Sequence, residues 1–305
     1  KYQRNVDAQV YKTAANTQQV PYMRLEDKAG NVAFFSSDGV IDDRTAPEGP
    51  SITITTPESK AGYYNGNVNF TIDVKDSATP DSARNKTYSG LKEVSYKIYK
   101  DGNSSSPTQT GNYNSELTAR KNRIQSLVKR ETINASLNNS NRVTIEVRAV
   151  DYAGNESVQT KEIKIDITAP RAEISFDLNN PLNGKYYNAT RTATVTVYER
   201  NFDPNDVHFT ITNTDGSMPS ISGWSIGSQT GVSDDTPNTC TVSFSTDGDY
   251  TMAMECTDLA GNGSNRADTP EFTIDKTVPT ISVAFDNNNA LNGKYYSTPR
   301  TATIT

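Results

Sequence analysis

A five-residue motif, Asp-x-Ala-Gly-Asn, occurs three times in this chain of 305 residues and constrains its fold more than any other feature. After each copy come a short apolar stretch, the sequence Asp-x-Thr-Ala-Pro or its Val variant, and a Tyr-Tyr pair. The three prolines of this repeat, Pro47, Pro170 and Pro279, are separated by roughly 110 to 120 residues, which suits one small domain per repeat rather than a solenoid turn. The repeat therefore predicts an array of small domains.

The residues around each motif predict a β-hairpin. Apolar residues alternate with polar ones before the motif, as Val143, Ile145 and Val147 do, and this is typical of an antiparallel strand with one buried face. A second short strand follows, so the five residues between form the turn. An Asp carboxylate can accept backbone N–H bonds from residues two or three further on, and Gly and Asn tolerate the positive φ of a tight turn. The predicted turn residues are Asp27, Asn31, Asp151, Asn155, Asp258 and Asn262.

The Asp-x-Thr-Ala-Pro segment predicts the boundary between domains. Proline has no N–H for a strand ladder and pushes its predecessor into extended geometry, so the strand ends there. The predicted junction residues are Pro47, Asp166, Pro170, Asp275 and Pro279. The predicted organisation is the C-terminal part of one domain at 1–44, whole domains at 45–168 and 169–277, and the N-terminal part of a further domain at 278–305. We expect both ends to fall inside domains of a longer array.

These motifs resemble those of tandem bacterial immunoglobulin-like (Ig-like) domains of secreted and cell-surface proteins. A second feature agrees: Thr246 to Tyr250 resembles the tyrosine corner of such sandwiches, where a tyrosine near the start of a strand bonds back to the preceding connection. The resemblance implies an all-β fold of tandem Ig-like β-sandwiches, two complete and two partial. It further implies a non-catalytic stalk or spacer in a large extracellular or cell-surface protein, such as an adhesin, whose partners within the chain are the neighbouring domains.

Composition limits the partners. The formal net charge is −6 and the sequence pI is about 5.0, so no overall positive field attracts nucleic acid. No apolar run approaches the roughly 20 residues that span a bilayer, so we expect no membrane insertion within this segment. Only 33% of the residues are hydrophobic, which is ordinary for small sandwiches in which each strand buries one face.

Signatures of catalysis are scarce. The only histidine, His208, lies on an alternating strand with no motif nearby, and neither a glycine-rich phosphate loop nor CxxC zinc spacing occurs. We therefore predict that the segment is not an enzyme and requires no cofactor.

Carboxylates recur at the predicted junctions, where Ca²⁺ with oxygen ligands could stiffen the array. The alternative is that these aspartates only cap turns, which needs no metal. The principal calcium candidates are Asp151, Asp166, Asp258 and Asp275, followed by Asp27, Asp43, Glu199, Asp203 and Asp206.

The two cysteines, Cys240 and Cys256, lie in one repeat at positions predicted to face the interior. A disulfide between neighbouring strands and a pair of buried free thiols are both compatible with this pattern.

The second domain is longer than the third because of polar stretches that include 101–130. Residues Glu116 to Lys129 have the spacing of a short helix with apolar residues near one face. This insertion, or Trp224 between polar turns, gives the alternative function of binding a host or cell-surface glycan or protein ligand. Two further roles are compatible with the repeats: an accessory spacer of a secreted hydrolase, and a subunit whose half-domains are completed by strand exchange between chains.

Overall fold

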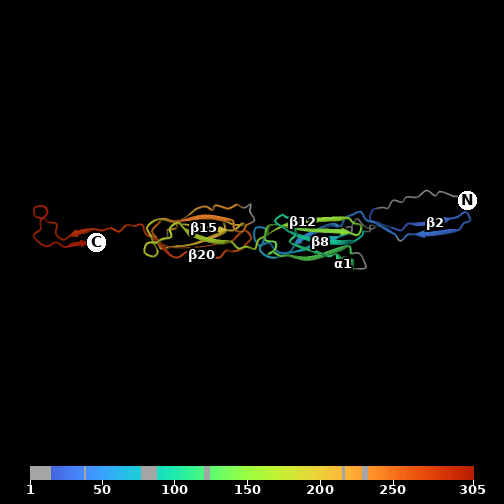
Figure 1. The fold of residues 1–305 in the computed structure, drawn as a ribbon, viewed down its shortest axis with the longest axis horizontal. Coiled ribbons are helices and arrows are strands. Elements are labelled where there is room, and N and C mark those ends of the chain that lie inside the picture. The colour runs from blue at the N-terminus through green and yellow to red at the C-terminus, as the bar shows by residue number, and fades with distance from the viewer. Residues whose placement is uncertain (1–14, 38, 77–87, 120–123, 215–216, 229–232) are drawn as a thin grey trace.

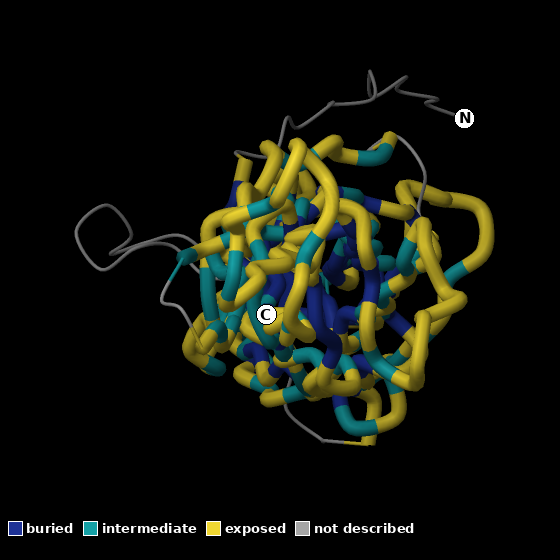
Figure 2. Tube along the Cα trace, turned by 90° about the vertical axis from the view of Figure 1, so that its left-hand side faces the viewer, coloured by how far each residue is buried: buried dark blue, intermediate teal, exposed yellow. Residues whose placement is uncertain are grey.

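The computed structural model describes residues 15–37, 39–76, 88–119, 124–214, 217–228 and 233–305. Its strands are gathered in bodies that follow one another along one long axis, in chain order from the N-terminus to the C-terminus (Figure 1). Viewed along that axis, buried residues lie at the centre and exposed residues surround them (Figure 2). The fold is all-β, and the described chain contains a single short helix.

The second domain is a sandwich of two sheets. One sheet has the order β10-β7-β5 and the other has the order β6-β12-β11-β8-β9. The first sheet comprises β5 (Glu48–Ile54), β7 (Val68–Lys75) and β10 (Ser126–Ile133). The second comprises β6 (Tyr63–Tyr64), β8 (Leu91–Lys100), β9 (Gln109–Asn112), β11 (Ser140–Asp151) and β12 (Glu156–Ile165).

Alternation along the strands places the core of this domain between the two sheets. On β7 every second residue from Val68 to Val74 is fully buried, and on β11 the same holds from Val143 to Ala149. Phe70 of the first sheet meets Tyr96 of the second edge to face, with ring centroids 5.7 Å apart.

The third domain repeats this plan with its own core. Its sheets have the orders β13-β15-β18-β17 and β14-β21-β19-β16, and β20 also pairs with β19. The first sheet comprises β13 (Arg171–Phe176), β15 (Arg191–Tyr198), β17 (Ser220–Ile221) and β18 (Pro237–Phe244). The second comprises β14 (Tyr186–Tyr187), β16 (Val207–Asn213), β19 (Gly248–Cys256), β20 (Ala267–Asp268) and β21 (Phe272–Ile274).

The tyrosine corner predicted from Thr246 to Tyr250 is confirmed. Tyr250 is 1% exposed, and its hydroxyl donates to the Thr246 carbonyl at 3.0 Å. Its ring stacks on Phe272, with centroids 5.7 Å apart, so the corner joins the connection before β19 to the centre of the core.

The Tyr-Tyr pairs form short strands at the far end of each whole domain. β6 pairs in parallel with the last residues of β12, and β14 pairs in the same way with β21. The first strand of each domain thus runs from one end of the domain toward the other before the chain reaches the Tyr-Tyr pair. Tyr63, which follows Pro47 in sequence, therefore lies at the joint after its own domain rather than at the joint near Pro47.

The terminal segments form two-stranded ladders. At the N-terminal side β1 (Thr17–Gln19) pairs with β4 (Val40–Asp42), and β2 (Tyr22–Glu26) pairs with β3 (Val32–Ser36). At the C-terminal side β22 (Val283–Phe285) pairs with β23 (Ala302–Ile304). Met23 and Leu25 alternate with polar residues, and this pattern predicts that both face inward. Both are more than half exposed, because the described chain carries no second sheet against them.

The helix predicted at Glu116 to Lys129 is wrong in extent. The helix α1 covers Asn114–Ala119, and the chain re-enters the sheet as β10 from Ser126. The spacing of the apolar residues fits either a helix or a strand. The chain forms a strand here because β7 offers an open edge, along which Leu127 pairs with Val74. The basic residues at 120, 121 and 123, which the same stretch contains, lie outside the described residues.

Candidate metal centres at the domain joints

The predicted hairpin turns are built alike in all three repeats. The Oδ1 atom of the motif Asp accepts the backbone N–H of the fifth residue at 2.9 Å in Asp27, 2.8 Å in Asp151 and 2.9 Å in Asp258. The glycine has φ of +86°, +92° and +87° in the three copies, a conformation that glycine adopts without strain. The Asp and Gly roles therefore follow from turn chemistry.

The asparagine of the motif has a different role from the predicted one. It has no positive φ in any copy; its side-chain amide binds the motif Asp and, in two copies, the linker of the preceding domain. Asn155 Nδ2 donates to the Asp43 carbonyl at 3.2 Å, and Asn262 Nδ2 donates to the Asp166 carbonyl at 3.0 Å. In the second and third domains this residue therefore ties the hairpin to the linker that enters the domain.

The linker aspartates form tight turns of their own. Asp43, Asp166 and Asp275 each accept the N–H of the threonine two residues later at 3.1 Å. Pro47 and Pro170 are buried, whereas Pro279 is exposed.

Three buried carboxylates meet at each of two joints. Joint cluster 1 consists of Asp43, Asp76 and Asp151, and joint cluster 2 consists of Asp166, Glu199 and Asp258. In each cluster one oxygen per residue lies within 4.8 Å of the others. The three members have the same origin at both joints: the linker, the residue directly after β7 or β15 of the following domain, and the hairpin turn of that domain.

Burial makes these clusters electrostatically expensive. Burial, with a smaller contribution from the neighbouring carboxylates, raises the pKa of Asp76 to about 6 and that of Glu199 to about 8. The pKa of Asp258 is also raised, chiefly by burial. Like charges this close cannot all be ionised in a dry site without a compensating cation.

Each cluster also holds an oxygen with no hydrogen-bond partner among the described residues. These atoms are Asp76 Oδ1 and Glu199 Oε2, in side chains that are 1% and 0% exposed. Buried polar atoms are normally paired, so an orphaned carboxylate oxygen inside a cluster of carboxylates is where a cation would bind. Oxygen ligands of this kind suit Ca²⁺.

Some of the predicted calcium residues belong to the two carboxylate clusters and others do not. Five of them belong to clusters: Asp43, Asp151, Asp166, Glu199 and Asp258. In the described ranges no cluster includes Asp27, Asp203, Asp206 or Asp275. The sequence reasoning missed Asp76, although its signal is present: an acid directly follows the alternating strand β7, as Glu199 directly follows β15.

The joint between the two whole domains, which we name joint 2, is crossed by further polar contacts. Lys60 Nζ lies 3.1 Å from Asp203 Oδ2 and 2.8 Å from Asp206 Oδ2. The Tyr63 hydroxyl donates to Asn201 Oδ1 at 3.1 Å. A loop of one domain is thus fastened to the strand ends of the next.

Among the described residues, Arg200 is the only basic side chain that contacts a carboxylate of either cluster, whereas Lys60 Nζ reaches only the backbone carbonyl of Asp258, at 3.2 Å. Arg200 is 4% exposed, and its Nη2 donates to Asp166 Oδ1 at 3.2 Å and to Asn139 Oδ1. Its Nε lies 3.1 Å from Asp234 Oδ1, as an ion pair rather than as a hydrogen bond. Thr168 of the linker donates to the other oxygen of Asp234 at 2.8 Å, which closes this network.

Both cysteines are buried free thiols in the third domain. Cys240 lies on β18 and Cys256 on β19, which belong to facing sheets. Burial raises the pKa of Cys240 to about 11 and also raises that of Cys256, so neither thiol is readily ionised.

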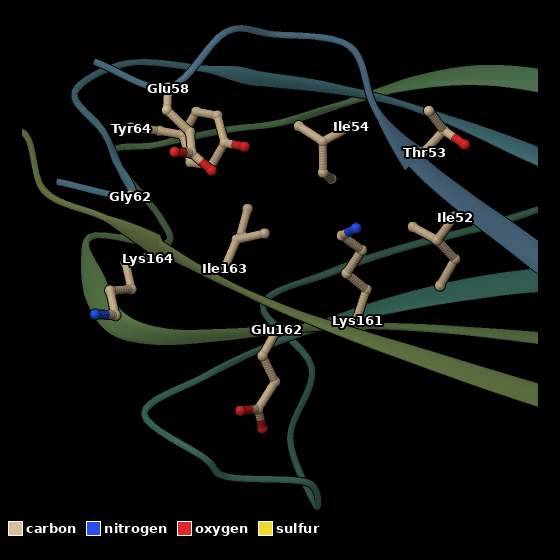
Figure 3. A pocket seen from close by; sticks show the side chains of 10 residues that line it. All are labelled: Ile52, Thr53, Ile54, Glu58, Gly62, Tyr64, Lys161, Glu162, Ile163 and Lys164. Atoms are coloured by element: carbon tan, nitrogen blue, oxygen red, sulfur yellow. The ribbon is translucent and has the colours of Figure 1, made fainter. Parts of the chain in front are cut away.

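Other features give little evidence of a ligand site. An open groove of about 360 Å³ lies beside β5 and β12; Ile54, Lys161 and Ile163 point into it, and Glu162 points away (Figure 3). Trp224 is partly buried and packs edge to face on Phe202, with ring centroids 4.7 Å apart. No described helix has the length and apolar character to cross a membrane.

Comparisons with known proteins give a family match for part of the chain and several structural similarities. Residues 49–167 match the family model described as bacterial Ig-like domain. No curated protein matches the sequence significantly. The structure resembles a tetra-tandem repeat from the extending region of a large adhesion protein, at 17% identity and a TM-score of 0.40, with 90% of this chain and 61% of that chain covered.

Two other solved structures are similar at lower scores. One is from a 1.5-MDa bacterial ice-binding adhesin, at 14% identity and a TM-score of 0.30, covering 78% of this chain and 69% of that chain. The other comprises fibronectin(III)-like modules of Clostridium thermocellum CbhA, at 11% identity and a TM-score of 0.23, covering 73% of this chain and 93% of that chain. The family match is confined to residues 49–167.

Proposed function

Because residues 49–167 form a bacterial Ig-like domain and the third domain repeats its motifs and topology, we propose that the chain is a non-catalytic spacer of an extracellular or cell-surface protein. The observation that carries this proposal is the construction of joint 2. The linker 166–170 is hydrogen-bonded to both domains, and the Tyr63 side chain of the second domain reaches the buried polar network of the third.

These contacts favour a fixed angle between domains. A flexible linker leaves its backbone groups to water, whereas the Asp166 carbonyl accepts from Asn262 and the Asp166 side chain accepts from Arg200. Domains joined this way add their lengths, which is what a spacer requires. The adhesin role is the more specific form of this proposal.

At joint cluster 1 we propose that Ca²⁺ completes the joint. Asp43, Asp76 and Asp151 would hold the ion, and its positive charge would permit all three carboxylates to ionise while buried. Folding of the chain brings these three acidic residues together from the linker, the strand end and the hairpin turn.

Small-angle X-ray scattering of the 305-residue chain tests the spacer proposal. We expect a scattering profile that one elongated arrangement of the two whole domains explains. A profile that requires an ensemble of widely different bend angles would contradict it.

Incubation with a glycan array tests glycan binding as the rival function, for which reproducible binding of one glycan class would be the supporting result.

A further inference from the structure

We propose that the two joints are neutralised differently: joint cluster 1 takes a divalent cation, and joint cluster 2 carries a built-in cation, the guanidinium of Arg200, in its place. This inference rests on the calcium proposal for cluster 1 and names the residue position that decides whether a joint depends on metal.

Hydrogen bonds show which positions correspond between the two domains. The Gly90 N–H donates to Asp76 at 2.5 Å, and its carbonyl accepts from Tyr152, which follows the hairpin Asp. The Asn201 N–H donates to Glu199 at 2.7 Å, and its carbonyl accepts from Leu259, which also follows the hairpin Asp. Gly90 and Asn201 therefore hold the same place.

The residues directly before them then correspond as well. They are Ser89 at joint cluster 1 and Arg200 at joint cluster 2, and both are buried. The Ser89 N–H donates to Asp43 Oδ2 at 2.7 Å, so this position contacts the linker aspartate at both joints. One joint has a neutral side chain there and the other has a permanent positive charge.

The charges of the two clusters differ accordingly. In the described ranges, which leave out 77–87, cluster 1 has no basic side chain in contact with its three carboxylates. In cluster 2, Arg200 binds Asp166, and Asn201 also donates to Asp166. A second cation would be repelled by the guanidinium and would find one of its ligands already bound.

Counting bound Ca²⁺ by native mass spectrometry of the 305-residue chain tests this inference. We expect one tightly bound ion in the wild type, none in Asp76→Asn, and still one in Glu199→Gln. Arg200→Ser should gain a second ion, which a further Glu199→Gln substitution should remove. Arg266→Ser is the matched control, because it removes an arginine whose partner is the exposed Asp268, and it should keep one ion.

The outcomes separate the two proposals. Two ions in the wild type, with one lost in Glu199→Gln, would overturn the role of Arg200 and leave calcium at cluster 1 intact. No bound ion in the wild type would overturn the calcium proposal and this inference together, while the scattering test of the spacer stands apart. If Arg200→Ser does not fold by circular dichroism, the wild type, Asp76→Asn and Glu199→Gln still decide, because a site at cluster 2 would show as an ion lost in Glu199→Gln.

Discussion

At the scale of single residues, the motif Asp makes the same turn in different repeats but lies in opposite environments, exposed in one repeat and buried in another. Asp27 is exposed, and its pKa is lowered, chiefly by the hydrogen bond from the Asn31 side chain. Asp258 makes the same bonds, but its pKa is raised, chiefly by burial. The motif therefore sets the local geometry, and the contact with the preceding domain sets the electrostatics.

The tyrosine corner gives a prediction at this scale. Tyr250→Phe removes the hydroxyl that donates to Thr246 and leaves the ring in place, so we expect a loss of about 1 kcal/mol in the unfolding free energy of the third domain. Chemical denaturation followed by circular dichroism measures it. Tyr186→Phe is the control, because Tyr186 is 45% exposed and should change stability far less. Equal effects of the two substitutions would contradict the corner's role.

The cysteines give a second residue-scale prediction. With the pKa of Cys240 raised to about 11, its thiol stays protonated at pH 8, and burial hides both sulfurs from reagents. A chromogenic thiol reagent at pH 8 should detect no thiol in the native chain and two per chain in denaturant. Detection of none after unfolding without reductant would show a disulfide instead.

At the scale of elements, the hairpins depend on a glycine conformation that other residues adopt only with strain. Gly154 has φ of +92°, and a Cβ added there would meet nothing within 4 Å, so Gly154→Ala tests backbone strain alone. We expect a loss of about 1 to 2 kcal/mol in the unfolding free energy of the second domain.

The matched control for that substitution is Gly223→Ala in the third domain. A Cβ there also meets nothing within 4 Å, but the backbone lacks a positive φ. The control should leave thermal unfolding nearly unchanged. A Gly154→Ala protein as stable as the wild type would mean that the turn adopts another conformation without loss of unfolding free energy.

Strands and turns could be predicted from sequence because their signals are local. The alternation of apolar and polar residues on β7 and β11, and the Asp and Gly of each turn, are signals that each span only a few residues. The extent of α1 could not be predicted, because the open edge of β7 decided where β10 begins. Asp76 was missed for a similar reason: its partners, Asp43 and Asp151, are distant in sequence and meet only when the linker packs on the next domain.

At the scale of the whole molecule, the joints determine length and direction. Two sandwiches with separate cores follow one another along one axis, and the polar network of joint 2 fastens them (Figure 1). Lys60→Ala together with Tyr63→Phe removes the contacts that these two side chains make with Asp203, Asp206 and Asn201. Each domain should keep its own core, so we expect two folded domains with a looser joint.

The distance distribution between spin labels on the two domains tests the fixed joint most directly. Labels at Gln159→Cys and Thr210→Cys sit on exposed strand positions, and the native thiols are buried. Pulsed electron paramagnetic resonance should give one narrow distance peak for the labelled chain and a broader one after Lys60→Ala with Tyr63→Phe. A broad distribution in the labelled chain without those two substitutions would show domains that swing freely, and would contradict the account of this chain as a spacer with fixed joints.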